Sequence, residues 1–174
     1  VNLGVVLGRL GKTQKSIEAY LSALQRDPAN PVAFFNLGTA YCEIGARQDA
    51  LEAFEELLAL APEYPQVRVA LANLLGEMGE TDRAIALLLE EIEIDRNAPR
   101  TWSSLGLAYI CSGNADRGEE CLLRALSLDE RYFNAICNLG MLYLGQKKYE
   151  AAVRVLQRAG DVDAERTKEI FGAK

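Results

Sequence analysis

Histidine is missing from the 174-residue chain, which removes the side chain that most often serves as a general base and as a metal ligand. No apolar stretch approaches the roughly 18 uncharged residues that a membrane-spanning helix needs. The first residues also lack the basic start and apolar run of a secretory signal. We therefore expect a protein that is not an enzyme, binds no metal or cofactor, and does not insert directly into a membrane.

The four cysteines show neither the paired spacing of a zinc site nor the density of a small secreted disulfide scaffold. They are Cys42, Cys111, Cys121 and Cys137, and we expect free thiols. Free thiols are typical of a reducing compartment, so a cytoplasmic location is expected. Because the chain begins with Val1 inside a periodic pattern, it reads as a piece of a longer protein whose targeting signals lie elsewhere.

A basic excess is also lacking, since the formal net charge is −6. Nucleic-acid binding needs clustered Lys and Arg to neutralise phosphates, so we expect no nucleic-acid partner. Apolar residues make up 49% of the chain and charged residues 25%, which is ordinary soluble usage. The chain can therefore bury a core.

The pattern that is present repeats every 34 residues. A leucine followed by glycine, or once by alanine, recurs in register five times, and its leucines are Leu3, Leu37, Leu71, Leu105 and Leu139. A second glycine follows seven residues later at Gly11, Gly45, Gly79 and Gly113, with Lys147 as the departure. Proline recurs at Pro31, Pro65 and Pro99, where its fixed φ suits the first position of a helix. The prolines therefore predict that a helix begins at the start of the repeat, and the second glycines predict a turn later in it.

Each repeat contains two helical stretches, for example Pro31 to about Ile44 and about Gln48 to Ala59. A glycine inside a helix costs about 1 kcal/mol relative to alanine, so its return after the leucine predicts close helix packing. Twelve residues after that glycine a small residue recurs: Ser16, Ala50, Ala84, Gly118 and Ala152. The repeat is therefore predicted to be a tightly packed helical hairpin.

These residues resemble the tetratricopeptide repeat (TPR) family. Trp102, Leu105, Gly106 and Tyr109 match its first-helix motif, and the second repeat matches nearly as well. The resemblance implies an all-α fold, a right-handed superhelical solenoid of stacked antiparallel helical hairpins. It implies one array over residues 1–166, with five repeats at about 1–30, 31–64, 65–98, 99–132 and 133–166. Residues 167–174 are expected to be the start of a further helix or a C-terminal tail.

One arc of each first helix lies opposite its motif residues, and in the family the corresponding positions line a concave groove for partners. Among these positions only Arg9, Glu43, Glu77 and Arg100 are charged, whereas a solvated helix face is usually rich in charge. We therefore interpret this face as a binding surface. The alternative is that curvature buries part of it, which would make residues such as Leu107 ordinary packing. The candidate partner-binding residues are Asn2, Val5, Phe35, Asn36, Thr39, Val69, Asn73, Arg100, Ser103, Leu107, Asn138 and Met141.

The family has two known groove chemistries, and this face differs from both to different degrees. The carboxylate clamp requires Lys, Asn and Arg at set positions, and its first lysine position here holds Val1, Phe35, Val69, Ser103 and Cys137. Capture of a chaperone tail is therefore disfavoured. Asn2, Asn36 and Asn138 resemble in part the asparagine ladder of the O-linked N-acetylglucosamine transferase superhelix, although Ala70 and Ser104 interrupt the row. Amide side chains both donate and accept, so such a row can pair with the backbone of an extended peptide.

The sequence thus predicts a protein-interaction scaffold that binds a protein or peptide partner. Two alternatives remain open. The chain could self-associate through uncapped ends, because stacked repeats need polar caps and neither end carries one. It could also be the recognition arm of a larger enzyme or complex.

Overall fold

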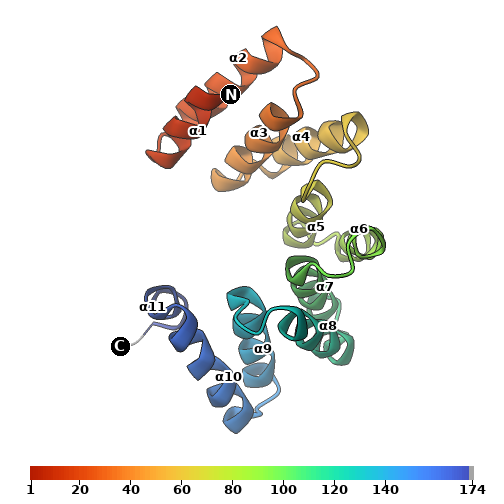
Figure 1. Cartoon of the computed structure of the whole chain (residues 1–174), viewed down its shortest axis with the longest axis vertical. Coiled ribbons are helices and arrows are strands. Elements are labelled where there is room, and N and C mark those ends of the chain that lie inside the picture. Colours follow the sequence, from red (N-terminus) through yellow and green to blue (C-terminus); the bar gives the residue numbers. More distant parts are fainter. Residues whose placement is uncertain (173–174) are drawn as a thin grey trace. The chain divides into compact units, whose positions relative to one another are not determined.

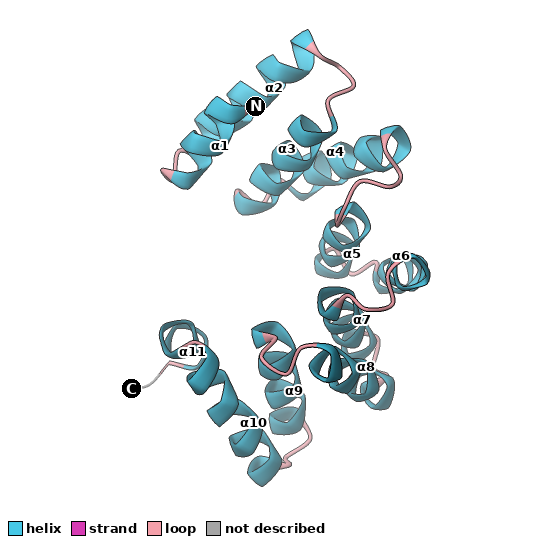
Figure 2. Ribbon diagram, viewed as in Figure 1, coloured by secondary structure: helices cyan, strands magenta, loops and turns pink. Residues whose placement is uncertain are grey.

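The computed structural model describes residues 1–172, which form eleven α-helices and no β-strand (Figures 1 and 2). The helices alternate with short connections. Their bounds are α1 Asn2–Arg9, α2 Thr13–Arg26, α3 Pro31–Glu43, α4 Arg47–Leu60, α5 Val67–Glu77, α6 Thr81–Ile94, α7 Pro99–Cys111, α8 Ala115–Leu128, α9 Phe133–Gly145, α10 Tyr149–Val162 and α11 Ala164–Phe171. The predicted all-α class is confirmed.

The chain divides into two compact units, one from Val1 to Glu80 and the other from Thr81 onward. In the first unit α1 packs on α2 and α3 on α4, while α2 contacts α3 and α4 contacts α5. In the second unit α7 packs on α8 and α9 on α10, with further contacts between α6 and α7, α8 and α9, and α10 and α11. The boundary lies inside the predicted third repeat, 65–98, so the single five-repeat array stays a prediction.

Two of the three predicted proline starts are confirmed. Pro31 and Pro99 stand in the first turn of α3 and α7. The Asn30 side chain caps α3 by accepting from the backbone N–H of Ala33 at 3.0 Å. A side-chain cap of this kind satisfies one of the N–H groups that a helix start leaves without a partner.

The prediction that Pro65 begins a helix is wrong, because α5 begins at Val67. Tyr64 to Val67 form a turn instead, in which the Val67 N–H donates to the Tyr64 carbonyl. Pro65 stands at its second position and Gln66 at its third, with φ 69° and ψ 0°. These are the dihedral angles of a type II turn, for which proline at the second position is favoured. The left-handed Gln66 prevents the helix from starting earlier.

The predicted turn seven residues after the motif glycine is present in all five repeats. Gly11, Gly45, Gly79 and Gly113 all have positive φ values, between 69° and 85°. Lys147, the one departure in the sequence, adopts the same left-handed backbone with φ 60°. A lysine in this region is strained, because its Cβ crowds the backbone.

The close helix approach predicted from the motif glycines is confirmed. A Cβ built on Gly38 would lie 2.6 Å from the Phe54 ring. Ser16, Ala50, Ala84, Gly118 and Ala152, the predicted small positions, are all buried. The glycines therefore offset their cost in helix propensity by letting a large side chain of the second helix pack against the first.

The motif leucines pack between hairpins. Leu37 of α3 lies in one buried cluster with Ile17 and Tyr20 of α2, and Leu139 of α9 lies in another with Leu122 of α8. Leu3 is the exception at 66% exposed, because no described helix precedes α1. The leucine position is thus satisfied by the second helix of the repeat before it.

The last described helix, α11, starts at Ala164, and the Asp163 side chain caps it by accepting from the Arg166 N–H at 3.0 Å. Residues 167–171 of the predicted segment 167–174 therefore belong to a helix. Residues 173 and 174 of that segment lie outside the described residues.

Candidate functional site

The predicted face consists of rows of residues spaced 34 apart on the first helices. The rows differ in how far their side chains are exposed. Most exposed is the row that holds Thr39, Asn73, Leu107 and Met141, with Val5 half-buried at its start. Asn2 and Arg100 are exposed as well, and Asn36 and Asn138 are half-buried. Ten of the twelve predicted residues, these nine and the half-buried Phe35, thus leave side-chain surface accessible within their own unit.

The prediction that Val69 and Ser103 bind a partner is wrong, because each is only 2% exposed. They share a register with Phe35 and with Cys137, which is also buried. This row is turned toward neighbouring helices rather than toward open solvent. The alternative interpretation, in which part of the face is buried, is therefore correct for the row of Val69 and Ser103. Leu107, in contrast, is exposed.

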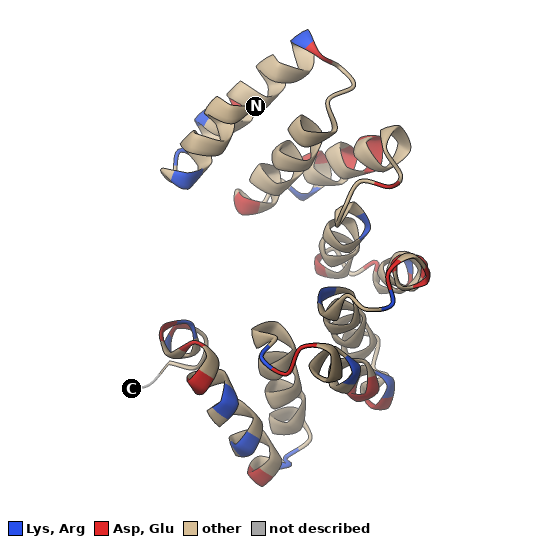
Figure 3. Ribbon diagram, viewed as in Figure 1, with Lys and Arg blue, Asp and Glu red and all other residues tan. Residues whose placement is uncertain are grey.

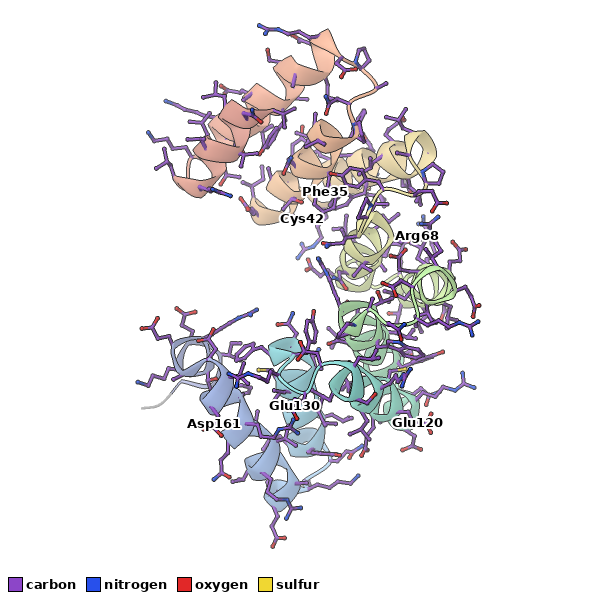
Figure 4. All side chains as sticks on the ribbon, in the orientation of Figure 1. Phe35, Cys42, Arg68, Glu120, Glu130 and Asp161 are labelled. Atoms are coloured by element: carbon purple, nitrogen blue, oxygen red, sulfur yellow. The ribbon has the colours of Figure 1, made fainter. Side chains whose placement is uncertain are left out.

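Phe35 shows what the buried row contacts. Its ring centroid lies 6.0 Å from that of Phe54 on α4 and 5.5 Å from that of Tyr64 in the α4–α5 connection (Figure 4). Both ring pairs are tilted, an arrangement favourable for aromatic side chains. Phe35 is therefore a half-buried residue that packs against Phe54 and Tyr64.

The polar side chains of α3 are partly used within their own helix. Asn36 Nδ2 donates to the Val32 carbonyl at 2.8 Å, and Thr39 Oγ1 donates to the Phe35 carbonyl at 2.9 Å. Asn36 keeps its amide oxygen and its second amide hydrogen for a ligand. Asn36 can thus accept a hydrogen bond from a peptide N–H and donate one to a peptide carbonyl.

Acidic groups on the face of the first unit have partners at the start of second helices. Glu43 accepts a hydrogen bond from Thr13 Oγ1 at 3.2 Å, and Glu77 lies 3.7 Å from Arg47 Nε. These carboxylates sit at the last residues of α3 and α5. Apart from these two residues, Arg9 at the end of α1 and Arg68 at the start of α5, the helices α1, α3 and α5 carry no charged residue.

In the second unit the face is apolar along α7 and α9. Leu107 is 44% exposed, Met141 57% and Leu144 41%. Arg100 is the only charged residue on these two helices, and the ribbon of α9 shows no charge at all (Figure 3). Large apolar side chains that remain exposed on a charge-poor face are typical of a surface that another molecule covers.

Sequence reasoning missed Arg166, which reaches this face from α11. Its Nη2 donates to Asn134 Oδ1 at 3.1 Å, and its guanidinium lies 4.6 Å from the Phe133 ring centroid. Asn134 occupies on α9 the position that Arg100 occupies on α7. No local signal marks Arg166, because it lies outside the first-helix register and its partners are 32 and 33 residues away in the sequence.

A second polar cluster in this unit is structural. Tyr143 OH donates to Glu119 Oε1 at 2.7 Å, Lys148 Nζ lies 3.8 Å from Glu119 Oε2, and the same ammonium stands 5.4 Å from the Tyr143 ring centroid. Burial, followed by the hydrogen bond and charge of Glu119, raises the pKa of Tyr143 to about 12. The cluster ties α8, α9 and the start of α10 together.

The cysteines are free thiols, as predicted. Cys42 and Cys111 are exposed, whereas Cys121 and Cys137 are buried. Burial raises the pKa of the Cys121 thiol to about 11, and it also raises the pKa values of Cys42 and Cys137. A raised pKa lowers the thiolate fraction on which cysteine reactivity depends.

Among residues 1–172, no three His, Cys, Asp or Glu side chains gather where they could hold a metal ion. Within the same residues, no helix combines the length and apolar composition needed to cross a bilayer.

Comparison with known proteins gives the family. Profiles described as tetratricopeptide repeat match residues 1–65, 45–108, 99–132 and 133–165. No curated protein matches the sequence significantly.

Solved structures share the fold. TTC0263, a thermophilic TPR protein of Thermus thermophilus, has a TM-score of 0.85 at 22% identity, covering 98% of this chain and 94% of that one. A crystal structure of MamA has a TM-score of 0.77 at 24% identity, covering 97% and 98%. YrrB, described as a TPR protein with an unusual peptide-binding site, has a TM-score of 0.68 at 19% identity, covering 98% and 88%. The matched profiles and the shared solenoid fold show that this chain belongs to the tetratricopeptide repeat family.

Proposed function

We propose that the chain is a protein-interaction scaffold that holds a segment of a partner protein against the face of its first helices. The observation that carries the proposal is the exposure of Leu107, Met141 and Leu144 on helices whose only charge is Arg100. Burying such side chains in an interface removes apolar surface from water, which is the main driving force of association. The peptide-binding site named for YrrB supports the same mode of action.

The first unit contributes polar recognition. Asn2, Thr39 and Asn73 are exposed on α1, α3 and α5, and Asn36 keeps an amide oxygen on the same face. Amides and hydroxyls can pair with the backbone of a partner segment without selecting its side chains. In the second unit, taken by itself, the exposed Leu107 and Met141 offer apolar contact.

Site-specific photo-crosslinking tests this proposal. A photoreactive phenylalanine analogue is placed at Thr39 or Leu107 on the face, and at Glu56 or Leu123 on second helices as controls. Leu123 is a close match because it is 48% exposed on α8. We expect each face position to crosslink to a discrete segment of a partner, identified by mass spectrometry of the crosslinked peptides. Equal crosslinking from the control positions contradicts the proposal.

A second candidate function is self-association, favoured by the exposure of Leu3, Val6 and Leu10 on and just after α1. Exposed apolar rows of this kind promote contacts between molecules. Light scattering over a concentration series tests it, and we expect the mass to rise with concentration and to fall back when Leu3 and Val6 are replaced by Ser. A constant monomer mass for the unmodified chain eliminates this candidate.

A further inference from the structure

Helix α1 presents an apolar surface whose equivalents elsewhere in the chain are buried. Leu3 is 66% exposed and Val6 is 54% exposed. The residues in the same register of α3, α5, α7 and α9 are at most 7% exposed, and they are Leu37, Ala40, Leu71, Leu74, Leu105, Ala108, Leu139 and Leu142. Each of these four helices packs against the second helix of the hairpin before it, in the pairs α2–α3, α4–α5, α6–α7 and α8–α9. The surface of α1 is therefore of the kind that a second helix covers.

Helix α10 presents the complementary surface. Val153 is 53% exposed, whereas Ile17, its equivalent on α2, is 3% exposed and lies in one cluster with Leu37 of α3. Glu119, its equivalent on α8, accepts a hydrogen bond from Tyr143 OH of α9 at 2.7 Å. This position of a second helix thus contacts the first helix of the next hairpin.

This part of α10 remains open because α11 is short. Helix α11 has 8 residues, against 13 in each of α7 and α9, and it ends at Phe171. Gly172 follows in the left-handed region with φ 49°, a common way for a helix to end. Helix α11 lies beside the end of α10, away from the connection between α9 and α10 (Figure 1). Tyr149 and Val153, on the first two turns of α10, are therefore exposed.

The 34-residue register shows where a first helix would lie on this part of α10. Phe171 stands five repeats after Val1, so α1, which begins at Asn2, takes up the register directly where α11 ends. Leu3 of a second copy would then meet Val153. This is the pairing that α2 and α3 make within the chain. The two exposed surfaces therefore complete each other without displacing α11.

The end of α1 also has a match on α10. Glu43, the last residue of α3, accepts a hydrogen bond from Thr13, the first residue of α2. The same two positions hold Arg9 on α1 and Tyr149 on α10. A guanidinium over the face of an aromatic ring is attracted by the ring quadrupole, so this pair would stabilise the contact.

We infer that the chain self-associates head to tail, with α1 of one copy packed on the first half of α10 of another. The inference rests on the second candidate function, self-association, and adds the two surfaces that meet. The surface on α10 continues the interface between α10 and α11, so a second copy extends packing that the chain already makes. Because the two surfaces differ, each contact leaves one surface of each kind unused, and open chains grow instead of closed dimers.

Sedimentation velocity of the full chain tests the inference. Concentrations from about 10 μM to about 1 mM suit the weak association expected of a small interface. Leu3→Asp combined with Val6→Asp removes the surface on α1, and Val153→Asp removes the surface on α10. We expect the mass of the unmodified chain to rise with concentration and each variant to associate about tenfold more weakly or less, because the contact would bury an unpaired carboxylate. Leu123→Asp, at a side chain 48% exposed on α8, is the control and should associate as the unmodified chain does.

A mixture of the two variants gives the sharper readout. The Val153→Asp chain keeps its α1 surface, and the chain with both α1 substitutions keeps its α10 surface. An equimolar mixture should therefore form a complex of one copy of each and grow no further. Circular dichroism checks that the variants keep their helices. A photoreactive phenylalanine analogue at Val153 gives a second measurement, and we expect it to crosslink to residues 1–12 of another copy.

The outcomes separate this inference from self-association in general. A mixture of the variants that stays monomeric overturns the inference, and so does Val153→Asp associating as strongly as the unmodified chain. In the latter case self-association survives through another contact, such as one between two α1 helices. An unmodified chain that stays monomeric at every concentration eliminates both. The partner-binding face is tested separately by the crosslinks from Thr39 and Leu107.

Discussion

Gly106 on α7 and Gly118 on α8 face each other at backbone distance. A Cβ on Gly118 would lie 2.9 Å from the Gly106 carbonyl oxygen and 2.5 Å from Ile110 Cγ1, and a Cβ on Gly106 would lie 3.0 Å from the Gly118 carbonyl oxygen. The other repeats place serine or alanine at the position of Gly118, so the α7–α8 hairpin is the one that has glycine at both facing positions. Backbone cannot yield as a flexible side chain does.

Gly118→Ala is therefore expected to destabilise the protein by about 1–3 kcal/mol, the usual cost of overpacking. Alanine would gain up to about 1 kcal/mol in helix propensity, but the overlap with the Gly106 carbonyl outweighs it. Urea unfolding followed by circular dichroism measures the change.

The matched control is Gly160→Ala in α10, where an added Cβ meets nothing within 4 Å. We expect it to stabilise by about 0.5–1 kcal/mol through helix propensity alone. If both alanine variants were stabilised alike, the account of α7–α8 packing would be wrong.

Lys147→Gly should stabilise the second unit by about 1 kcal/mol, since glycine adopts φ 60° without the clash that a lysine Cβ makes. Lys147→Ala removes the charge and keeps the strain, so it should leave stability nearly unchanged. Thermal unfolding of the three proteins distinguishes backbone strain from charge as the cause. A gain with alanine equal to that with glycine argues against strain.

High pH should weaken the second unit through Tyr143. Its pKa in the folded protein is about 12, against 10.0 for the ordinary side chain, so the folded state holds this proton more tightly. The stabilisation is complete below pH 10 and is lost as the pH rises toward 12. Tyr143→Phe should flatten the decline of the urea midpoint over this window. Parallel declines in both proteins would show that Tyr143 is not responsible.

Alkylation should separate the four thiols. We expect Cys111 to react first with iodoacetamide at neutral pH, because it is exposed, and Cys121 to react only when α8 unfolds, because it is buried and its pKa is about 11. Mass spectrometry of the modified peptides over time gives the order. Early labelling of Cys121 in the folded protein would contradict the burial described for α8.

Local features were predictable from the sequence because they depend on a few adjacent residues. The turn at Gly45 and the start of α3 at Pro31 follow from backbone preferences alone. Even Lys147 was placed correctly, since its register identified the turn that its residue type does not favour.

The sequence predictions failed where the position of a residue depends on contacts with residues far away in the sequence. Pro65 does not begin a helix, and the Tyr64 ring at the start of its turn packs against Phe35, which lies 29 residues earlier in the same predicted repeat, 31–64. The sequence prediction placed Val69 and Ser103 on the open face because it divided each first helix into a packed arc and an opposite, exposed arc. A helix in a stack contacts neighbours on more than one side, so both residues are buried. Arg166 was missed because its role depends on Asn134 and Phe133, which only folding brings near.

The chain contains two methionines, and their methyl groups test the central claim within one molecule. Met141 is exposed on the α9 face, and Met78 lies in the turn that ends α5. With carbon-13 methyl labels, NMR spectra are recorded as the partner segment identified by crosslinking is added to saturation. We predict that the Met141 signal shifts or broadens while the Met78 signal stays in place. A Met141 signal that is unchanged in the fully bound protein would contradict the claim that the first-helix face holds the partner.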